Sequence, residues 1–393
     1  MEKTQYFFYA ALITIGRARE MRNGPHPLSV HLGMAAANMS AIQKYASNFS
    51  HILSEEDAVE MVRGISMYQQ HSYQPEAMAT ETIWSKNGVS IKLPLLKSPI
   101  KQVSKFPLLF VPSIINKANI LDIAEERSML RWFNEQGIAT YLLDWGDFSN
   151  NYDKDITINN LVSDLLSAAI CEVSKATNSQ IDIMGYCMGG TLLLPAYMSA
   201  PEHIRRMILL AAPWDFKVKP YELARNVRIW SQQVLPVVKE RGHLPSDWVQ
   251  ALFASIDPNG SAQKFIKFAS MDQEGSEAKL FIAVEDWLND GVDLPGNIAS
   301  HCIQDWFIDN KLVMGDWLLE NQKLTMEEID AKILIMASNK DRLVPLQCAV
   351  NVEKKLKQAS VDIIELDCGH VGLIVGRGAI KTVWQPIFNW LSS

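Results

Sequence analysis

The sequence is poor in cysteine, and its few cysteines are far apart. It has five in 393 residues, and none forms the closely spaced pair of a zinc site: Cys171, Cys187, Cys302, Cys348 and Cys368. An odd number of scattered cysteines argues against a disulfide framework and suits a reducing compartment. We therefore predict no metal site, no cofactor and a cytoplasmic protein.

Long apolar runs and an excess of positive charge are also missing. The apolar run Tyr6–Ile15 has ten residues, whereas a membrane-spanning helix needs about 20. Its near-neutral flank is unlike the start of a signal peptide, so only attachment to a surface stays open. The formal charge of −7 is unsuited to gripping nucleic acid, and we predict no such partner.

Strand-like and helix-like segments alternate regularly over residues 75–216 and again over 326–393. With 48% hydrophobic residues the chain can bury a large core. Alternation with short loops indicates an α/β fold, with a mostly parallel sheet covered by helices on both faces. The predicted strands are Phe106–Val111, Ile138–Leu143, Ile181–Met184, Met207–Ala212, Lys332–Ala337 and Val361–Leu366, with edge strands within Trp84–Leu96 around Asn87-Gly88.

Two further segments interrupt this pattern. Residues 1–74 form a predicted helical accessory segment, and residues 217–325 a cap inserted over the carboxyl edge of the sheet. Pro195 is expected to kink or shorten the helix after Ile181–Met184. The other helices predicted from apolar spacing are Tyr6–Arg19, Leu32–Phe49, Ser54–Tyr68, Ile120–Gln136, Ile156–Ala176, Leu346–Lys357 and Ala379–Leu391.

The stretch Gly185-Tyr-Cys187-Met-Gly189-Gly-Thr stands between a predicted strand and a predicted helix. This is the pattern of a nucleophile elbow, with cysteine in place of the usual serine. Small residues are needed on both sides because the tight turn brings backbones close together. A thiol at a helix N-terminus is favoured as thiolate. A buried structural cysteine flanked by glycines is the alternative interpretation.

A cysteine nucleophile needs a base, and the base needs an acid that orients it. In an α/β-hydrolase sheet the acid and the histidine follow the nucleophile in two loops after late strands. Asp341 and His370 follow Lys332–Ala337 and Val361–Leu366 in that order. Asp367 is a rival acid, and Asp341 could instead only begin a turn. The residue types, their order along the chain and their positions after predicted strands together predict a Cys187–His370–Asp341 triad.

The oxyanion hole should use the backbone N–H of Met188 and a second N–H from the loop after Phe106–Val111. Ser113, Ile114 and Ile115 are the candidates for the second donor, and we favour Ile115.

A cysteine nucleophile also bears on the reaction. It forms a thioester, so its acylation by an incoming thioester is nearly neutral in energy and keeps the acyl group activated. This favours acyl transfer to a hydroxyl, with a tryptophan-rich cap that excludes water.

The chain resembles polyhydroxyalkanoate synthases over roughly residues 100–393, and is most similar to the class III catalytic subunit. The motifs that carry the resemblance are Pro107–Lys117 with Ile120–Asp122, Leu143–Gly146, Gly185–Thr191, Trp287–Asp290 with Leu294–Gly296, Asn310–Leu312, Asp341–Pro345 and Gly369-His370. The longer N-terminal part, Ser113 and Pro195 depart from the family pattern.

The resemblance implies a polymerase that converts (R)-3-hydroxyacyl-CoA into polyester and releases coenzyme A, which is part of the substrate. Cys187 would be acylated, His370 would be the general base, and Asp341 would orient it. Trp287 and Asp290 would lie at the substrate entrance, although a buried cap tryptophan more often only packs. The expected partners are the growing polyester, a class III-type helical subunit and a second copy of the chain, and the expected location is the granule surface in the cytoplasm.

Two alternatives to the polymerase stay open. An intracellular polyester depolymerase or acyl-CoA thioesterase could use the same triad and fold. An inactive granule-associated scaffold is the other alternative, and the presence of all three triad residues argues against it.

Overall fold

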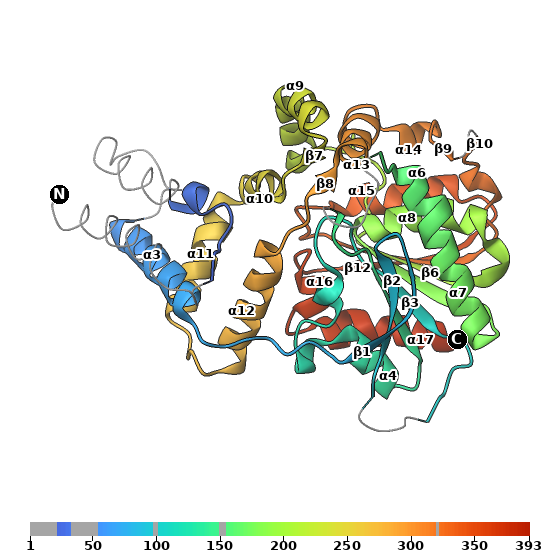
Figure 1. Ribbon diagram of the computed structural model, residues 1–393, viewed down its shortest axis with the longest axis horizontal. Coiled ribbons are helices and arrows are strands. Elements are labelled where there is room, and N and C mark those ends of the chain that lie inside the picture. The colour runs from blue at the N-terminus through green and yellow to red at the C-terminus, as the bar shows by residue number, and fades with distance from the viewer. Residues whose placement is uncertain (1–21, 33–53, 97–100, 149–154, 320–321) are drawn as a thin grey trace. The chain divides into compact units, whose positions relative to one another are not determined.

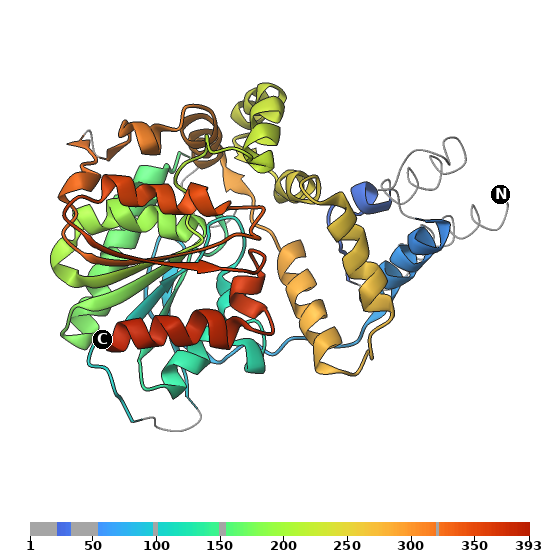
Figure 2. The same cartoon turned by 180° about the vertical axis from the view of Figure 1, so that it is seen from behind.

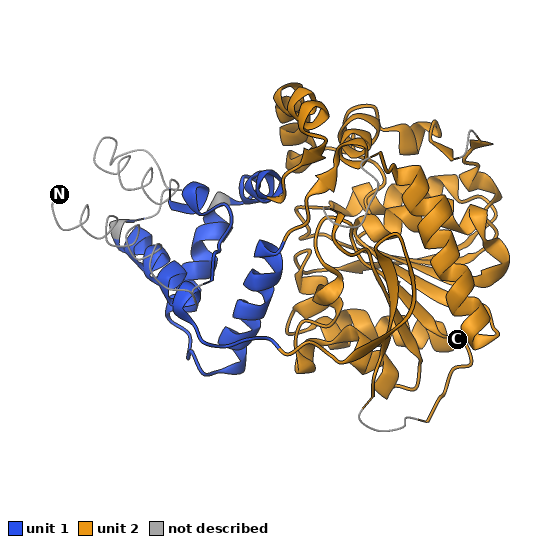
Figure 3. Ribbon diagram, viewed as in Figure 1, with its two compact units in different colours: residues 1–75, 247–290 blue, residues 76–246, 291–393 orange. Residues whose placement is uncertain are grey.

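The structure is a computed structural model that describes residues 22–32, 54–96, 101–148, 155–319 and 322–393. Its internal contacts divide the chain into two compact units (Figure 3). We call residues 1–75 with 247–290 the helical unit, and residues 76–246 with 291–393 the sheet unit. The predicted helix Tyr6–Arg19, and all of Leu32–Phe49 after its first residue, lie outside the described residues.

The sheet unit is built on one eight-stranded sheet, which confirms the predicted α/β class (Figure 1). The strand order is β1-β2-β4-β3-β5-β6-β11-β12. The pairs β1–β2 and β2–β4 are antiparallel, and the remaining pairs are parallel. The bounds are β1 Thr80–Lys86, β2 Val89–Pro94, β3 Leu108–Val111, β4 Thr140–Asp144, β5 Ile181–Tyr186, β6 Ile204–Leu210, β11 Lys332–Ser338 and β12 Ser360–Leu366.

The burial of the strands follows their position in the sheet. Every residue of β3 and β5 is buried, whereas β1 at one edge is exposed along much of its length. The turn between β1 and β2 is Asn87-Gly88, whose φ angles are 47° and 84°. Two positive φ angles are what a two-residue hairpin needs, so the predicted edge strands around Asn87-Gly88 are confirmed.

Helices cover both faces of the sheet, as predicted. Helix α7 lies in front of the sheet in Figure 1, and α17 lies in front of it in Figure 2, which is the view from behind. The helices between and after the core strands are α4 Met129–Glu135, α6 Ile158–Asn160, α7 Ser167–Thr177, α8 Met188–Ser199, α15 Leu346–Val350, α16 Gly372–Val375 and α17 Gln385–Ser392. The π-helical stretch Leu161–Leu166 joins α6 to α7.

Helices α4 and α15 are shorter than the predicted helices Ile120–Gln136 and Leu346–Lys357, and α8 is longer than Pro195 led us to expect. Helix α4 begins at Met129 rather than Ile120, because Ser128 caps it by accepting from the Arg131 N–H at 3.0 Å and the residues before it form 3₁₀ turns. Helix α15 passes into a 3₁₀ segment after Val350. Pro195 does not end α8, which continues to Ser199.

The inserted residues do not form one compact cap. Residues 217–246 and 291–325 belong to the sheet unit with α9 Glu222–Arg241, α13 Gly296–His301 and α14 Lys311–Met314. Residues 247–290 group with the N-terminal segment instead, which differs from the predicted division at 217 and 325. The reason lies in the apolar faces of the helices, which cover one another within the helical unit.

The helical unit contains α3 Glu55–Gln70, α11 Pro258–Ala269, α12 Ser276–Asn289 and most of α10 Ser246–Ala254. Helix α3 confirms the predicted helix after Ser54, whose side chain accepts from the Asp57 N–H at 3.0 Å. Helices α3 and α11 pack closely at Gly64, where an added Cβ would lie 2.0 Å from the Phe265 carbonyl oxygen. The buried core is Met61, Val62, Ile65, Tyr68, Ala262, Phe265, Phe268, Ala278 and Ile282.

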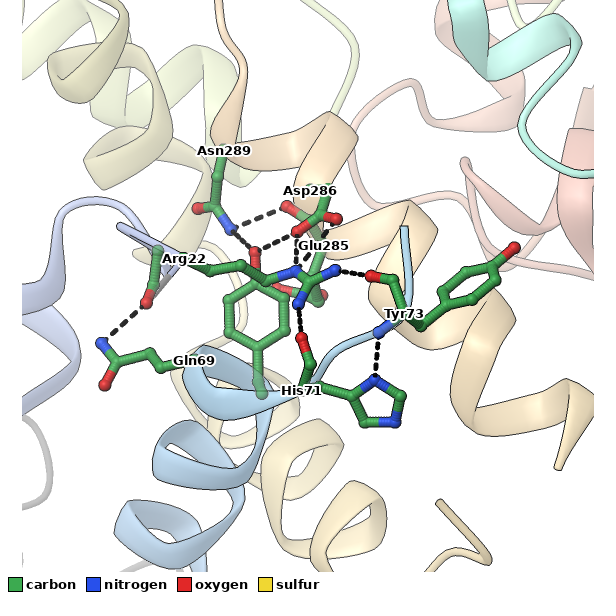
Figure 4. A network of polar contacts seen from close by, with 9 residues as sticks. Arg22, Gln69, His71, Tyr73, Glu285, Asp286 and Asn289 are labelled. Atoms are coloured by element: carbon green, nitrogen blue, oxygen red, sulfur yellow. Dashed lines mark hydrogen bonds and ion pairs between the residues drawn. The ribbon is translucent and has the colours of Figure 1, made fainter. Parts of the chain in front are cut away.

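A polar network fastens the first described segment to this core (Figure 4). The Arg22 guanidinium pairs with the Asp286 carboxylate at 2.7 Å and also donates to the carbonyls of His71 and Tyr73. The Tyr68 hydroxyl donates to the same carboxylate at 2.8 Å. Asp286 thus joins α12 to α3 and to residue 22.

Candidate active site

Cys187 lies on the sharp turn between β5 and α8, as the elbow pattern predicts. Its φ and ψ are 54° and −129°, which is unusual for a residue with a side chain. A Cβ on Gly185 would lie 2.3 Å from the Gly190 Cα, and one on Gly189 would lie 2.2 Å from the Val111 carbonyl oxygen. The prediction that this turn requires small residues is therefore confirmed.

Asp341 and His370 come from the loops after β11 and β12, and their side chains meet. The Asp341 Oδ2 lies 2.6 Å from the His370 Nδ1, and both residues are buried. The other carboxylate oxygen accepts from the N–H groups of Leu343 and Val344 at 2.9 and 2.8 Å. The rival acid Asp367 instead pairs with Lys340 at the surface.

The imidazole of His370 also makes a hydrogen bond with the Cys187 side chain. Burial alone lowers the pKa of His370. The negative charges of Asp341 and the Cys187 thiolate, together with the hydrogen bonds to both, outweigh burial and raise the pKa of His370 well above its usual value. The structure therefore brings the three predicted side chains together, with the His370 imidazole between the Cys187 thiol and the Asp341 carboxylate.

Two residues that sequence reasoning missed hold this arrangement. The Ser338 hydroxyl, at the end of β11, lies 3.0 Å from the Leu366 carbonyl and 2.5 Å from the Cys368 carbonyl, and it accepts from the Cys368 N–H at 2.9 Å. It joins the two loops that carry the acid and the histidine. The Tyr186 ring stacks on the His370 imidazole, with centroids 5.1 Å apart. Nothing in the sequence connects Ser338 or Tyr186 with the His370 loop, although Tyr186 directly precedes Cys187.

The two predicted oxyanion donors lie at the ends of their elements. Met188 is the first residue of α8, where backbone N–H groups have no partner within the helix. The Ile115 N–H lies 3.4 Å from the Ser113 Oγ, and its carbonyl accepts from the Val292 N–H at 3.2 Å. The role of both N–H groups stays a prediction.

The fold agrees with comparisons to known proteins. A sequence profile described as alpha/beta hydrolase fold matches residues 162–377, which is more than half of the chain. The chain belongs to the α/β-hydrolase fold family. A second profile, described as the N-terminus of poly-beta-hydroxybutyrate polymerase (PhaC), matches residues 85–133 of this hydrolase-fold chain.

Curated relatives carry a polymerase name. The poly(3-hydroxyalkanoate) polymerase subunit PhaC of Haloferax mediterranei is 27% identical over 318 residues, which are 79% of this chain and 63% of the relative. The protein of the same name from Haloarcula marismortui is 29% identical, and the match covers 76% of this chain and 63% of that relative. The chain thus spans less than two thirds of the length of these two relatives. They confirm the resemblance seen in the sequence.

The solved structures are more distant. An alpha/beta hydrolase fold protein from Chitinophaga pinensis has a TM-score of 0.46 and 16% identity, covering 80% of this chain and 98% of that one.

Trp287 and Asp290, the predicted substrate entrance, belong to the helical unit of this α/β-hydrolase-fold chain. Trp287 is a buried residue of α12, and Asp290 is the residue that ends this helix. Their predicted role at the entrance stays a prediction.

The remaining cysteines differ from Cys187 in their surroundings. Burial raises the pKa of the Cys348 thiol to about 12, and it also raises the pKa of Cys302. Within the described ranges, no group of His, Cys, Asp or Glu side chains could hold a metal ion. No helix in the same ranges is both long and apolar enough to span a membrane.

Proposed function

We propose that this α/β-hydrolase-fold protein polymerises (R)-3-hydroxyacyl-CoA into a polyester and releases coenzyme A. The observation that carries the proposal is the contact of Cys187 with His370 and of His370 with Asp341, on a fold whose relatives are named poly(3-hydroxyalkanoate) polymerases. The match to the PhaC N-terminus over residues 85–133 supports the same activity.

In the first step, His370 takes the Cys187 proton and the thiolate attacks the thioester carbonyl of the substrate. The bond between that carbonyl carbon and the coenzyme A sulfur breaks, and the departing thiolate receives the proton from His370. One thioester replaces another, so the acyl group stays activated on Cys187. The N–H groups of Met188 and Ile115 would stabilise the oxyanion of the tetrahedral intermediate.

In the second step, a 3-hydroxyl group attacks the Cys187 thioester. His370 takes the hydroxyl proton as the new ester bond forms, and it returns a proton to the departing Cys187 sulfur. Asp341 holds the imidazole in the orientation that both transfers need, since its carboxylate is fixed by two backbone N–H groups. Water attacking in place of the hydroxyl would give hydrolysis instead.

The location of the protein and its partners are part of the same proposal. We expect a cytoplasmic protein at the surface of polyester granules, which works with a class III-type helical subunit and with a second copy of its own chain. Trp287 and Asp290 would contribute to the entrance for the acyl-CoA.

Incubation of the purified protein with 3-hydroxybutyryl-CoA tests the activity. Free coenzyme A, turbidity and free 3-hydroxybutyrate are followed together, with and without a class III-type partner subunit. Coenzyme A release with insoluble polymer is the expected result. Release with only soluble acid would assign a thioesterase. Polymer that the protein degrades rather than makes would assign a depolymerase, and no reaction in either direction would favour a scaffold.

The acylated residue is tested by mass spectrometry of the protein after brief exposure to the same substrate. Cys187→Ala should abolish the acyl adduct, because the attacking sulfur is lost. Cys368→Ala is the matched control, because this half-buried cysteine lies two residues from His370 and has no role in the proposed steps. An undiminished adduct in Cys187→Ala would remove Cys187 from the mechanism.

A further inference from the structure

Tyr221 is a buried residue of the sheet unit that directly precedes helix α9. Its ring stacks on Phe216 with a centroid distance of 6.4 Å, and it also lies 6.4 Å from the Phe307 ring. Arg228, in the second turn of α9, donates to the carbonyls of Phe216 and Phe307 at 3.2 and 3.1 Å. The position of the Tyr221 ring is therefore fixed by packing on both neighbours.

The hydroxyl of Tyr221 reaches the loop that carries the acid of the site. It donates to the Leu343 carbonyl at 2.8 Å. The N–H of the same residue, Leu343, donates to the Asp341 Oδ1 at 2.9 Å, and the Asp341 Oδ2 lies 2.6 Å from the His370 Nδ1. Three successive contacts thus connect the residue before α9 with the imidazole.

The hydroxyl is in the right state to act as a donor. Burial, and then the charges of Cys348, Cys187 and Asp341, raise the pKa of Tyr221 well above its usual value, so the hydroxyl keeps its proton. The titratable groups that face Tyr221 are Cys348, whose side chain also shares a hydrogen bond with the Tyr221 hydroxyl, Cys187 and Asp341. Those that face His370 are Asp341, Cys187 and the stacked Tyr186. No part of the proposed reaction requires Tyr221 to ionise.

We propose that Tyr221 is a positioning residue that fixes the Asp341 carboxylate against His370 by holding the Leu343 carbonyl, and so links the start of α9 to the reactivity of Cys187. The inference rests on the proposed function in one respect, namely that Cys187 is the nucleophile. Tyr221 itself transfers no proton and need not touch substrate.

The physical reason concerns the geometry of a short loop. Asp341 is held through one carboxylate oxygen by the N–H groups of Leu343 and Val344, so any movement of Leu343 moves the carboxylate. Without the Tyr221 hydroxyl, the Leu343 carbonyl loses the donor that fixes it. The contact between Asp341 and His370 then weakens, the imidazolium is stabilised less, and a smaller fraction of Cys187 is thiolate at neutral pH.

The test is Tyr221→Phe, which keeps the ring and its packing and removes only the hydroxyl. The rate of Cys187 alkylation by iodoacetamide is measured by mass spectrometry from about pH 5 to about pH 9. We expect the rate at neutral pH to fall roughly three- to ten-fold, the loss that one hydrogen bond accounts for. We also expect the lower apparent pKa of the profile to move upward.

Tyr197→Phe is the matched control. The Tyr197 hydroxyl also donates to a backbone carbonyl, that of Asp330, at 2.6 Å. It lies on α8 ten residues after Cys187, or about 15 Å along the helix, so the same chemical change should leave the profile as in the wild type. Thermal melting of each variant reports its own loss of stability, so that a slower reaction of Cys187 is separated from partial unfolding.

The outcomes separate this inference from the proposed function. If wild-type Cys187 reacts no faster than a free thiol, the proposed nucleophile fails. If wild-type Cys187 is activated but Tyr221→Phe has the same rate and pH profile, the positioning role is overturned while the proposed function stands. A profile that shifts equally in Tyr197→Phe also overturns the positioning role.

Discussion

The glycine at position 189 offers a sharp test of the elbow geometry. Replacing Gly189 with alanine would put a Cβ 2.2 Å from the Val111 carbonyl oxygen and 2.5 Å from that of Pro112. Ordinary contacts begin near 3.4 Å, so each oxygen would have to move by about an ångström. Neither can do so easily, because Val111 ends the buried strand β3 and the Trp145 indole donates to the Pro112 carbonyl at 3.0 Å.

We expect Gly189→Ala to reduce the free energy of unfolding by about 3 kcal/mol, at the upper end of the cost of overpacking a close contact. At ordinary urea dependences this lowers the midpoint of unfolding by about 1 M. Urea unfolding followed by tryptophan fluorescence measures the shift. Cys187 alkylation should slow as well, because the displaced loop starts at Pro112, next to the proposed oxyanion donors.

Gly369→Ala is the control, in the loop directly before His370. A Cβ there would meet no atom within 4 Å, and the residue does not have positive φ. Its stability should stay the same or rise by up to about 1 kcal/mol, since alanine restricts the unfolded chain. Equal midpoints for Gly189→Ala and Gly369→Ala would refute the argument that close backbone approach fixes the elbow glycine.

Three further predictions concern other parts of the molecule. Burial lowers the pKa of His31 from 6.5 to about 4, so the unfolded chain binds more protons between these values. The neutral, buried His31 should therefore stabilise the helical unit fully above pH 6.5, and about 3 kcal/mol of this contribution should be lost as the pH falls from 6.5 to about 4. His31→Gln should flatten that part of a curve of unfolding free energy against pH, and an unchanged slope would contradict the assignment. Asp286→Ala should cost about 2 kcal/mol, because it leaves the Arg22 charge without its partner; hydrogen exchange in α3 should speed up, whereas Glu274→Ala, in an exposed pair, should leave it unchanged. Ser338→Ala should weaken the link between the acid and histidine loops and lower turnover roughly ten-fold, without raising the KM; a raised KM at constant turnover would argue against a positioning role.

The core of the fold and the places of Cys187, Asp341 and His370 in it could be predicted because their signals are local. The central strands are short apolar runs, and the loops after β11 and β12 supply Asp341 and His370. The α/β-hydrolase order of nucleophile, acid and histidine then connects three positions that the sequence alone leaves far apart. The glycines beside Cys187 have a steric cause that is visible in the sequence pattern itself.

The positioning contacts could not be predicted, because they join residues far apart in the chain through backbone carbonyls. Nothing in the local sequence of Ser338 or Tyr221 indicates which carbonyl its hydroxyl will meet. The grouping of residues 247–290 with the N-terminal segment was missed for a related reason. The apolar face of a helix such as α3 shows that something covers it, but not which helix does.

The composition of the helical unit from two distant stretches of chain has a consequence during synthesis. Helix α3 ends at Gln70, and its packing partner α11 begins only at Pro258. At translation rates of ~5–20 residues per second, the apolar face of α3 has no native cover for about 10–40 s. Holdase chaperones that recognise exposed apolar helices should therefore bind nascent chains that stop before residue 258 and release those that continue past residue 290.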